Sequence, residues 1–384
     1  MCYSAHLKQK VEWLERTTGA VLDIDAYREL FHFASEQPQY YALSKAMYQD
    51  FLRPGKRGEE KLKPLAERYQ QQQIALWEQE KAEAQAVLAE LETKLARKET
   101  KTNRLNHTRK QKKIKQLNAK IAHIKKEQLS HDDHRIFPGY YGNGVIQEAG
   151  QLKIVPMRYR FFRATGNILD DLLYDKNSTL YNCRSDALTP ERFAEKKAQL
   201  QATYKQRLQR LKKHTEDILS PKSIREKNQL QRNLQLLEAY GYEIGDIKSE
   251  VLKQSVWEPA LGHQHGILFM EKFYEHVQRH DYEQRPLAHN ESAQSVTISF
   301  YPDTAEILQV PVLYTKTAFK NGRHMLSCAI ITQEPPAEVL AHGHDRCPIH
   351  LARGSQFLQA QQPEQALQAL TDIKAIHFVA SDQV

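Results

Sequence analysis

A long stretch that is almost free of helix-breaking residues constrains the fold more than any other feature of this chain. Residues 43–131 contain almost no glycine or proline after Gly58. Apolar residues there occupy the a and d positions of a heptad, with Lys81 as a polar a residue: Ile74, Trp77, Ala84, Leu88, Leu91 and Leu95. After a polar break at 98–108 the spacing returns: Ile114, Leu117, Ile121 and Ile124. The pattern predicts two helices that fold back as an antiparallel coiled-coil hairpin.

The charge of the chain is concentrated in this hairpin. The whole chain carries 55 basic and 47 acidic residues, for a net charge of +8. Between Lys94 and Lys126, basic residues are frequent and Glu99 is the one acid. Two interpretations stay open: a solvated helical arm without chemistry, or a basic face that follows phosphates by releasing counterions. The partners of the helical insertions are left open.

The remainder of the chain alternates between strand-like and helical texture. Residues 137–187 are typical of strands and turns, with turn chemistry at Pro138-Gly139 and Gly142-Asn143-Gly144 and β-forming residues over Leu152–Phe162. Residues 190–254 return to helix, with a break at Ser220-Pro221 and an end near Gly241. Short β-type segments follow at Ser295–Phe300, Gln309–Thr315 and Met325–Ile331, and a final helix covers about 363–370.

These textures predict an α+β fold with a β-rich core that two helical hairpins interrupt. The core is built from residues 1–42, 132–192 and 255–384. The basic coiled-coil hairpin covers 43–131, and a second helical hairpin covers 193–254.

Composition excludes several classes of protein. The longest apolar runs, around Ile267–Met270 and Val310–Tyr314, fall far short of the roughly 20 residues that a membrane span needs. The start of the chain lacks the basic and apolar regions of a signal peptide. Four cysteines without a CxxC pair are too few for a disulfide framework. We therefore expect a soluble, cytoplasmic protein with no membrane partner.

Cys2 is the first candidate for chemistry. Because cysteine is small, the initiator Met1 is normally trimmed, which leaves a free 1,2-aminothiol. An α-amine has a reference pKa of about 8, so part of it is neutral near pH 7. Its amine can form an imine with an aldehyde, and its thiol can then close a five-membered thiazolidine in an intramolecular step. A cysteine at position 2 is by itself weak evidence for this chemistry.

Three further stretches combine polar and aromatic residues: 181–186 (Tyr-Asn-Cys-Arg-Ser-Asp), 272–276 (Lys-Phe-Tyr-Glu-His) and 344–348 (His-Asp-Arg-Cys-Pro). Each alone can be a turn or the end of a strand. A metal site was weighed for the last stretch because His342, His344, Cys347 and His350 cluster there. Their irregular spacing and the stiffness of Pro348 argue against it. We predict no metal and no cofactor.

In this order, and together with Met1-Cys2 and Met157-Arg158-Tyr159, the stretches resemble the SRAP family, the SOS response-associated peptidases or abasic-site processing proteins. Members of that family begin Met-Cys-Gly-Arg. They continue with a Met-Arg-Trp-Gly-like strand and with Asn-x-Arg-x-Glu, Gly-Phe-Tyr-Glu-Trp and His-x-Arg-Met-Pro motifs. The resemblance covers about 220 residues. This chain departs from the pattern at these positions: Tyr3, Ser4, Tyr159, Asp186, Lys272, His276 and Cys347.

The resemblance implies a DNA-damage function in which the chain crosslinks abasic sites of single-stranded DNA covalently through Cys2. On that basis Glu275 would move the proton of the α-amine and His344 would act on the sugar oxygen during ring opening. Asn182 would orient the adduct. Arg184 would clamp a flanking phosphate with its fork of donors, and Tyr159 would stack on a base. Arg158 is the third residue expected to bind DNA.

Lyase and autopeptidase activity are further expectations from the same resemblance. Two other classes remain as alternatives. One is an amino-terminal-nucleophile cysteine peptidase, which would need Cys2 to attack an amide next to an oxyanion hole. The other is a non-enzymatic DNA-binding coiled-coil protein in which residues 62–130 do the binding.

Overall fold

The computed structural model describes residues 3–36, 38, 41–53, 58–162, 180–243 and 255–382. The chain divides into two compact units. One is formed by Met1–Leu22 with Arg135–Val384, and the other by Asp23–His134. The first unit contains long strands and helices and the second is helical, so the prediction of an α+β fold is confirmed.

Five strands of the first unit form a closed ring, in the order β5–β6–β11–β10–β8 and back to β5. Their bounds are Tyr140–Glu148 for β5, Gln151–Tyr159 for β6, His265–Gln278 for β8, Leu308–Ala318 for β10 and His324–Gln333 for β11. All neighbours are antiparallel except β6 and β11, which run parallel. The core is therefore barrel-like. The β-type segments predicted at 309–315 and 325–331 lie on its strands, and the one predicted at 152–162 lies on β6 as far as Tyr159.

The ring closes where β8 meets β5, and glycine makes this closure possible. Val145 pairs with Ile267, and Ile146 pairs with Gly266. A Cβ atom at Gly266 would lie 3.0 Å from Val312 Cγ2 and 3.3 Å from the Val145 carbonyl. The absence of a side chain thus lets three backbones approach one another closely.

Short strands extend this sheet. β1 (Ser4–Leu7) pairs with both β8 and β4 (Arg135–Ile136), while β9 (Ser295–Pro302) pairs with β8 and with β13 (Phe378–Asp382). The remaining strands are β2 (Val21–Leu22) beside β6, and β7 (Asn182–Arg184) and β12 (Cys347–Pro348) beside β11. β8 is the longest strand, and it connects the barrel to the amino-terminal strand.

The prediction of a turn at Gly142-Asn143-Gly144 is wrong, because all three residues lie inside β5. Both glycines serve close packing instead. A Cβ atom would lie 2.8 Å from Leu7 Cδ1 at Gly142 and 2.8 Å from Met157 Sδ at Gly144. Between them, the Asn143 backbone N–H donates to Gln9 Oε1 at 2.9 Å.

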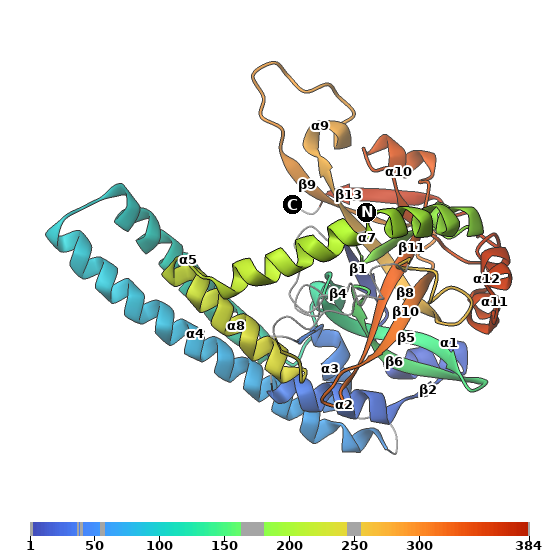
Figure 1. The fold of residues 1–384 in the computed structure, drawn as a ribbon, viewed down its shortest axis with the longest axis horizontal. Helices are drawn as coiled ribbons and strands as arrows, with labels where there is room; N and C mark the ends of the chain where they lie inside the picture. Colours follow the sequence, from blue (N-terminus) through green and yellow to red (C-terminus); the bar gives the residue numbers. More distant parts are fainter. Residues whose placement is uncertain are drawn as a thin grey trace. The chain divides into compact units, whose positions relative to one another are not determined.

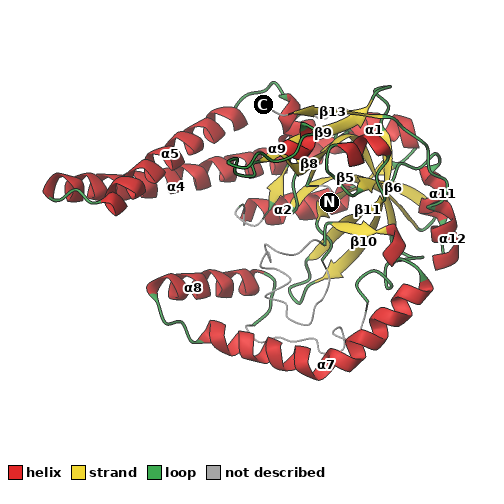
Figure 2. Cartoon of the chain, turned by 90° about the horizontal axis from the view of Figure 1, so that it is seen from above, coloured by secondary structure: helices red, strands yellow, loops and turns green. Residues whose placement is uncertain are grey.

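Helices accompany the barrel. α7 (Pro190–Leu219) and α8 (Ile224–Ala239) are the helices of the segment where the second hairpin was predicted, with the expected break at Ser220-Pro221 (Figure 2). Residues 244–254 of the predicted hairpin lie outside the described residues. The other helices are short: α1 (Val11–Thr18), α9 (Arg279–Tyr282), α10 (Ala337–Ala341), α11 (Gly354–Gln359), α12 (Pro363–Ala369) and the 3-10 turn η3 (Ser185–Ala187). α12 confirms the final helix predicted from the sequence.

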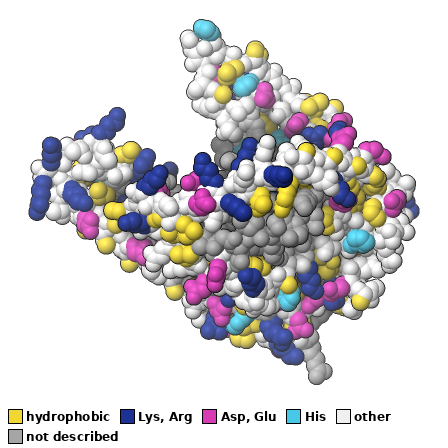
Figure 3. Space-filling model, in the orientation of Figure 1, with side chains coloured by type: hydrophobic (Ala, Val, Ile, Leu, Met, Phe, Trp, Pro, Cys, Tyr) yellow, Lys and Arg dark blue, Asp and Glu magenta, His cyan; other side chains and the backbone are white. Residues whose placement is uncertain are grey.

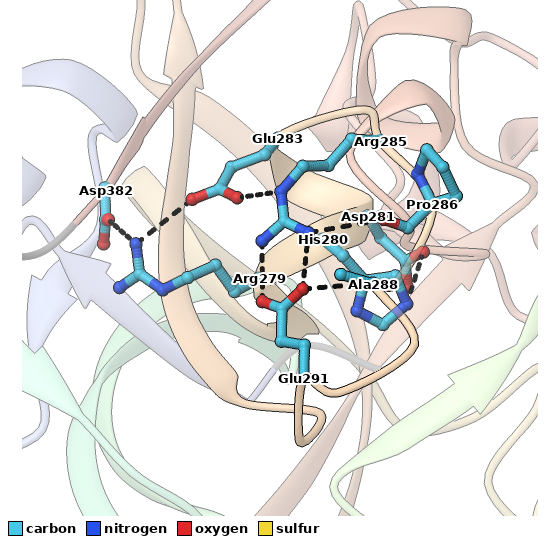
Figure 4. A network of polar contacts seen from close by, with 9 residues as sticks. All are labelled: Arg279, His280, Asp281, Glu283, Arg285, Pro286, Ala288, Glu291 and Asp382. Atoms are coloured by element: carbon cyan, nitrogen blue, oxygen red, sulfur yellow. Dashed lines mark hydrogen bonds and ion pairs between the residues drawn. The ribbon is translucent and has the colours of Figure 1, made fainter.

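An ion-pair network holds the loop between β8 and β9 (Figure 4). The Arg285 guanidinium donates to both carboxylate oxygens of Glu291, at 2.6 and 2.7 Å, and its Nε donates to Glu283 at 2.6 Å. Arg279 lies 3.5 Å from Glu283 and 3.9 Å from Asp382, which is on β13. The network therefore ties the start of this loop to the edge of the sheet.

The second unit contains the helical hairpin. α4 (Lys63–Arg97) and α5 (Lys101–Ile124) lie side by side in Figures 1 and 2. Cross-helix contacts such as Lys113–Glu80 at 3.0 Å and His107–Glu92 at 3.4 Å show that they run antiparallel. Of the predicted heptad residues, Ala84, Leu91, Leu117, Ile121 and Ile124 are buried and the others half-buried. The antiparallel hairpin is thus present.

Helices preceding the hairpin belong to the same unit. α2 (Ile24–Glu36) and α3 (Lys45–Leu52) pack on α4 through an aromatic cluster, in which the Phe31 and Phe51 ring centroids lie 5.6 Å apart. Minor elements complete it: β3 (Ala42–Leu43), η1 (Glu59–Lys61) and η2 (His131–His134). The compact unit therefore begins at Asp23, whereas the sequence pattern placed the start of the insertion at 43. The segment that contains α2 joins the hairpin because its apolar face is covered by α4.

Candidate functional site

A buried carboxylate and a histidine form the centre of the candidate site. Glu275 lies on β8, and His344 lies in the turn after α10. Glu275 Oε2 and His344 Nε2 are 3.0 Å apart, and the two side chains are 1% and 10% exposed. Burial raises the pKa of Glu275 above its ordinary value, while the hydrogen bond with His344 acts in the opposite direction.

The other ring nitrogen of His344 fixes the orientation of the imidazole. Nδ1 lies 2.8 Å from the carbonyl oxygen of Arg346, which accepts a hydrogen bond from a protonated Nδ1. The Arg346 backbone N–H also approaches Nδ1, at 3.4 Å, so both backbone groups of Arg346 hold the ring with Nε2 toward Glu275. Glu275 Oε2 and His344 Nε2 are thus held within hydrogen-bond distance of each other. Such a pair can deliver or accept a proton at a neighbouring reacting group.

Strand β11 brings the two distant motifs together. Ile330 and Thr332 pair with Asn182 and Arg184 of β7 in parallel register. Thr332 also pairs with Pro348 of β12 in antiparallel register. Residues 182–186 and 344–348 therefore meet around the end of one strand, although about 160 residues separate them in the chain.

Asp186 joins these motifs electrostatically. Its carboxylate accepts hydrogen bonds from Arg184 at 3.1 and 2.9 Å and from Arg346 at 2.6 Å. The hydrogen bond from Arg184 and the hydrogen bond and charge of Arg346 hold the pKa of Asp186 well below its usual range. The sequence pattern did not assign Asp186 or Arg346 to the site, although both stood inside the quoted motifs. The sequence signal that could have identified them was their opposite charge, because Asp186 and Arg346 stand in two motifs that were expected to form one site.

Asn182 and Tyr159 occupy neighbouring buried positions. Asn182 is buried on β7, and its Oδ1 accepts a hydrogen bond from the Tyr159 hydroxyl at 3.4 Å. Tyr159 is 0% exposed, and its ring packs edge-on against Tyr181 at 5.7 Å. The expectation that Tyr159 stacks on a DNA base does not fit this burial, because no face of its ring reaches solvent. Its contact instead fixes the Asn182 amide.

The two arginines of the predicted DNA-binding set differ in exposure. The Arg184 side chain is 60% exposed, so one side of its guanidinium reaches solvent while the other binds Asp186. Arg158 is half-buried on β6, where it pairs with Ser327 of β11 and with Tyr141 of β5. Both residues therefore lie on strands that contact β11.

The amino-terminal strand approaches the site along β8. The Tyr3 N–H donates to the Tyr274 carbonyl at 2.9 Å, and Ser4 pairs with Tyr274. Tyr3 packs against His276 with ring centroids 3.8 Å apart, and so it lies beside the residues that flank Glu275. Cys2, the predicted nucleophile, lies outside the described residues.

A glycine turn presents His344, and the sequence pattern did not identify it. Gly343 has φ +81°, and a Cβ atom there would lie 2.6 Å from Asp281 Cβ. Tyr282 and His342 add a ring contact at 5.2 Å across the same interface. The α9 segment, which the Arg285 network holds, therefore packs directly against the turn that carries His344.

Within the described ranges, no group of three or more His, Cys, Asp or Glu side chains could hold a metal ion. The histidines of the carboxyl-terminal cluster have other contacts. His344 binds Glu275 as above, and His350 Nδ1 accepts the backbone N–H of Gln309 at 2.9 Å. Cys183, Cys328 and Cys347 are buried free thiols. No helix in the described part of the chain is long and apolar enough to cross a membrane.

Comparison with solved structures gives distant similarities. A protein of Bacteroides thetaiotaomicron is 9% identical with a TM-score of 0.36, and the match covers 65% of this chain and 76% of that one. A protein of Bordetella bronchiseptica is 13% identical with a TM-score of 0.33, covering 65% and 86%. A phage-related protein of the same organism is 11% identical with a TM-score of 0.34, covering 65% and 80%. At such TM-scores these similarities carry no argument.

Comparison of sequences gives one family. A search of curated proteins finds no match. The family model of the SOS response associated peptidases (SRAP) matches residues 235–382. That range includes Glu275 and His344, while Cys2, Asn182 and Arg184 lie outside it. The resemblance predicted from the motifs is thus confirmed for the carboxyl-terminal part of the chain, where residues 235–382 match the SRAP family model.

Proposed function

We propose that this protein captures abasic sites in single-stranded DNA, as a covalent thiazolidine on the amino-terminal residue Cys2. The observation that carries the proposal is the buried Glu275–His344 pair, with 3.0 Å between Oε2 and Nε2, beside the amino-terminal strand β1, which begins at Ser4 and pairs with β8. The match to the SRAP family model supports a role in the DNA-damage response and binding to DNA.

The proposed chemistry begins with the neutral α-amine of Cys2. The nitrogen lone pair attacks the C1′ aldehyde of the ring-opened sugar and forms a carbinolamine. Loss of water from the carbinolamine gives an imine. The thiol sulfur then adds to the imine carbon, its proton moves to the nitrogen, and a five-membered thiazolidine results. No oxidant or reductant is needed, and water is the one product released.

Glu275 and His344 supply the proton transfers in this proposal. A carboxylate at Glu275 takes a proton from the attacking amine and returns it to the departing hydroxyl. His344 protonates the ring oxygen of the closed sugar, which opens to the aldehyde. The raised pKa of Glu275 favours the protonated carboxyl, which suits a group that must give a proton as well as accept one.

Asn182 and Arg184 position the DNA in the same proposal. The Asn182 amide, held by Tyr159, orients the sugar. The exposed side of the Arg184 guanidinium binds a flanking phosphate, since Asp186 fixes the fork of donors in one plane. Arg346 is buried behind Asp186, so it acts by holding this carboxylate.

The central test uses single-stranded DNA in which a glycosylase has excised one uracil. Wild-type protein is expected to give a heat-stable shifted band. Cys2→Ala keeps an amine but has no thiol, so it should lose the stable product while borohydride still traps its imine. That trapped product is the control for folding and binding. If Cys2→Ala forms the heat-stable band as well as wild type without borohydride, the proposed nucleophile is wrong.

A further inference from the structure

Helix α5 has an unbalanced charge. Its 24 residues include eight Lys or Arg and no acid: Lys101, Arg104, Arg109, Lys110, Lys112, Lys113, Lys115 and Lys120. Its partner α4 mixes the two signs along its length. The positive charge of the hairpin is therefore carried by one of its two helices, and Figure 3 shows Lys and Arg side chains gathered toward the end of the hairpin.

Four of the eight cations occupy the side of α5 that faces away from α4. Leu117, Ile121 and Ile124 are the buried positions of this helix. At 100° per residue, Lys101, Arg104, Lys112 and Lys115 point to the opposite side, and Arg109 lies at its flank. All five are exposed. The packing of the hairpin thus leaves a continuous basic face in solvent.

Most of this face has no acidic neighbour. Arg104 pairs with Glu99, and at the flank Lys113 pairs with Glu80 at 3.0 Å. Within the described ranges, no ion pair involves Lys101, Lys112 or Lys115. From Lys101 to Lys115 the face extends about 21 Å at 1.5 Å per residue. Like charges at this density repel one another, so an anionic partner would relieve the repulsion.

The composition of the face favours nucleic acid over protein or membrane. Protein interfaces are rich in aromatic residues and poor in lysine. This face is rich in lysine, and Leu105, 48% exposed, is its large apolar residue. A membrane-surface helix needs an exposed apolar side, but on α5 that side is buried on α4. Lysine is a point charge suited to phosphate without base recognition.

The same composition favours a duplex over a single strand. Proteins that bind single strands combine cations with aromatic rings that stack on bases. The exposed face of α5 has no aromatic residue. A duplex instead presents about one charge per 1.7 Å along a straight axis, which a straight basic helix can follow. We propose that the exposed basic face of α5 binds the phosphate backbone of double-stranded DNA without sequence preference. The proposal goes beyond the chemistry at Cys2 and stands without it.

The test measures how salt weakens binding of the full-length protein to an undamaged, fluorescently labelled duplex. Each lost phosphate contact lowers the slope of log K against log salt by about 0.9. Lys101→Gln/Lys112→Gln/Lys115→Gln should therefore flatten the slope by about 3. Glutamine keeps the helix propensity close to that of lysine, and circular dichroism checks that helicity is unchanged.

A matched control removes three cations elsewhere in the same unit: Lys61→Gln/Lys63→Gln/Arg68→Gln. This variant has the same net charge as the test variant, and its slope should stay near that of wild type. If the salt slope flattened equally in both variants, the effect would depend on net charge alone, and the proposal would be overturned. An unchanged slope in the test variant would also overturn it, as would a loss confined to a single strand of the same length.

The outcome is separable from the chemistry at Cys2. Cys2→Ala should leave the salt slope for undamaged duplex unchanged. The triple α5 variant should form the heat-stable adduct with abasic single-stranded DNA at the wild-type rate when DNA is saturating. If the α5 variant loses that saturated rate, its face contributes to the reaction and is not a separate duplex-binding surface.

Discussion

At the scale of single residues, two glutamates four positions apart on β8 are in opposite electrostatic situations. Burial raises the pKa of Glu275, and the hydrogen bonds with His344 and with the Tyr3 backbone do not offset it. Glu271 has two basic partners, His6 at 2.9 Å and Lys8. The hydrogen bond from His6, followed by that from Lys8, lowers the pKa of Glu271 to about 2. Glu275 therefore favours its protonated form, and Glu271 favours its ionised form.

Because their pKa values are shifted in opposite directions, Glu275 and Glu271 should change the stability of the fold with pH in opposite directions. The folded state holds the proton of Glu275 more tightly than the unfolded chain, so this group stabilises the fold at low pH. That contribution is lost as pH rises through the raised folded pKa. Glu275→Gln should therefore raise the melting temperature at neutral pH and leave it unchanged near pH 4, the ordinary range of a glutamate pKa.

Glu271→Gln is the control for this prediction. The charge of Glu271 stabilises the fold above its unfolded pKa, and that contribution is lost as pH falls toward about 2. Its replacement should lower the melting temperature at neutral pH. Glu275→Gln should also slow adduct formation by about 10²–10⁴-fold at saturating DNA. A change in half-saturating DNA concentration alone, with the maximal rate intact, would make Glu275 a binding residue.

At the scale of elements, the turn after α10 decides where His344 lies. Gly343 and Gly322 have the same φ of +81°, but a Cβ atom at Gly322 meets nothing within 4 Å. Gly322→Ala therefore adds backbone strain alone. Gly343→Ala adds the same strain and a clash with Asp281. The pair of variants separates the conformation of the backbone from the contact with α9.

We expect Gly343→Ala to cost about 1–3 kcal/mol of strain and to displace His344 from Glu275. Adduct formation should slow toward the rate of His344→Ala, while Gly322→Ala should keep the wild-type rate. Denaturant unfolding and single-turnover crosslinking measure the two effects. A wild-type rate in Gly343→Ala would show that the contact with α9 does not position the histidine.

At the scale of the whole molecule, the proposed chemistry requires a free α-amine on the mature chain. Cysteine at position 2 is small enough for removal of the initiator methionine. Intact mass spectrometry of the purified protein should therefore show a chain that lacks Met1 and carries no acetyl group. A chain that retains Met1, or is acetylated on Cys2, and still forms the heat-stable adduct would rule out thiazolidine chemistry.

Local pattern was sufficient for much of the architecture. Heptad spacing predicted the hairpin and three of its buried residues, Leu91, Leu117 and Ile121, because a helix buries one side at a fixed period. Runs of β-forming residues located β10 and β11, since a buried strand needs apolar residues in sequence. The resemblance, carried by short motifs, located Glu275 and His344. These properties belong to segments of a few residues, and so the sequence by itself determined them.

Tertiary structure decided which of these segments meet. The parallel pairing of β7 with β11 joins Asp186 to Arg346, and β8 brings Glu275 to His344. Burial of Tyr159 and the inclusion of Gly142 and Gly144 in β5 depend on the neighbours that close the barrel. Strand register, closure of the ring and the pKa of a buried carboxyl arise from contacts between residues far apart in the chain. No local pattern contains that information.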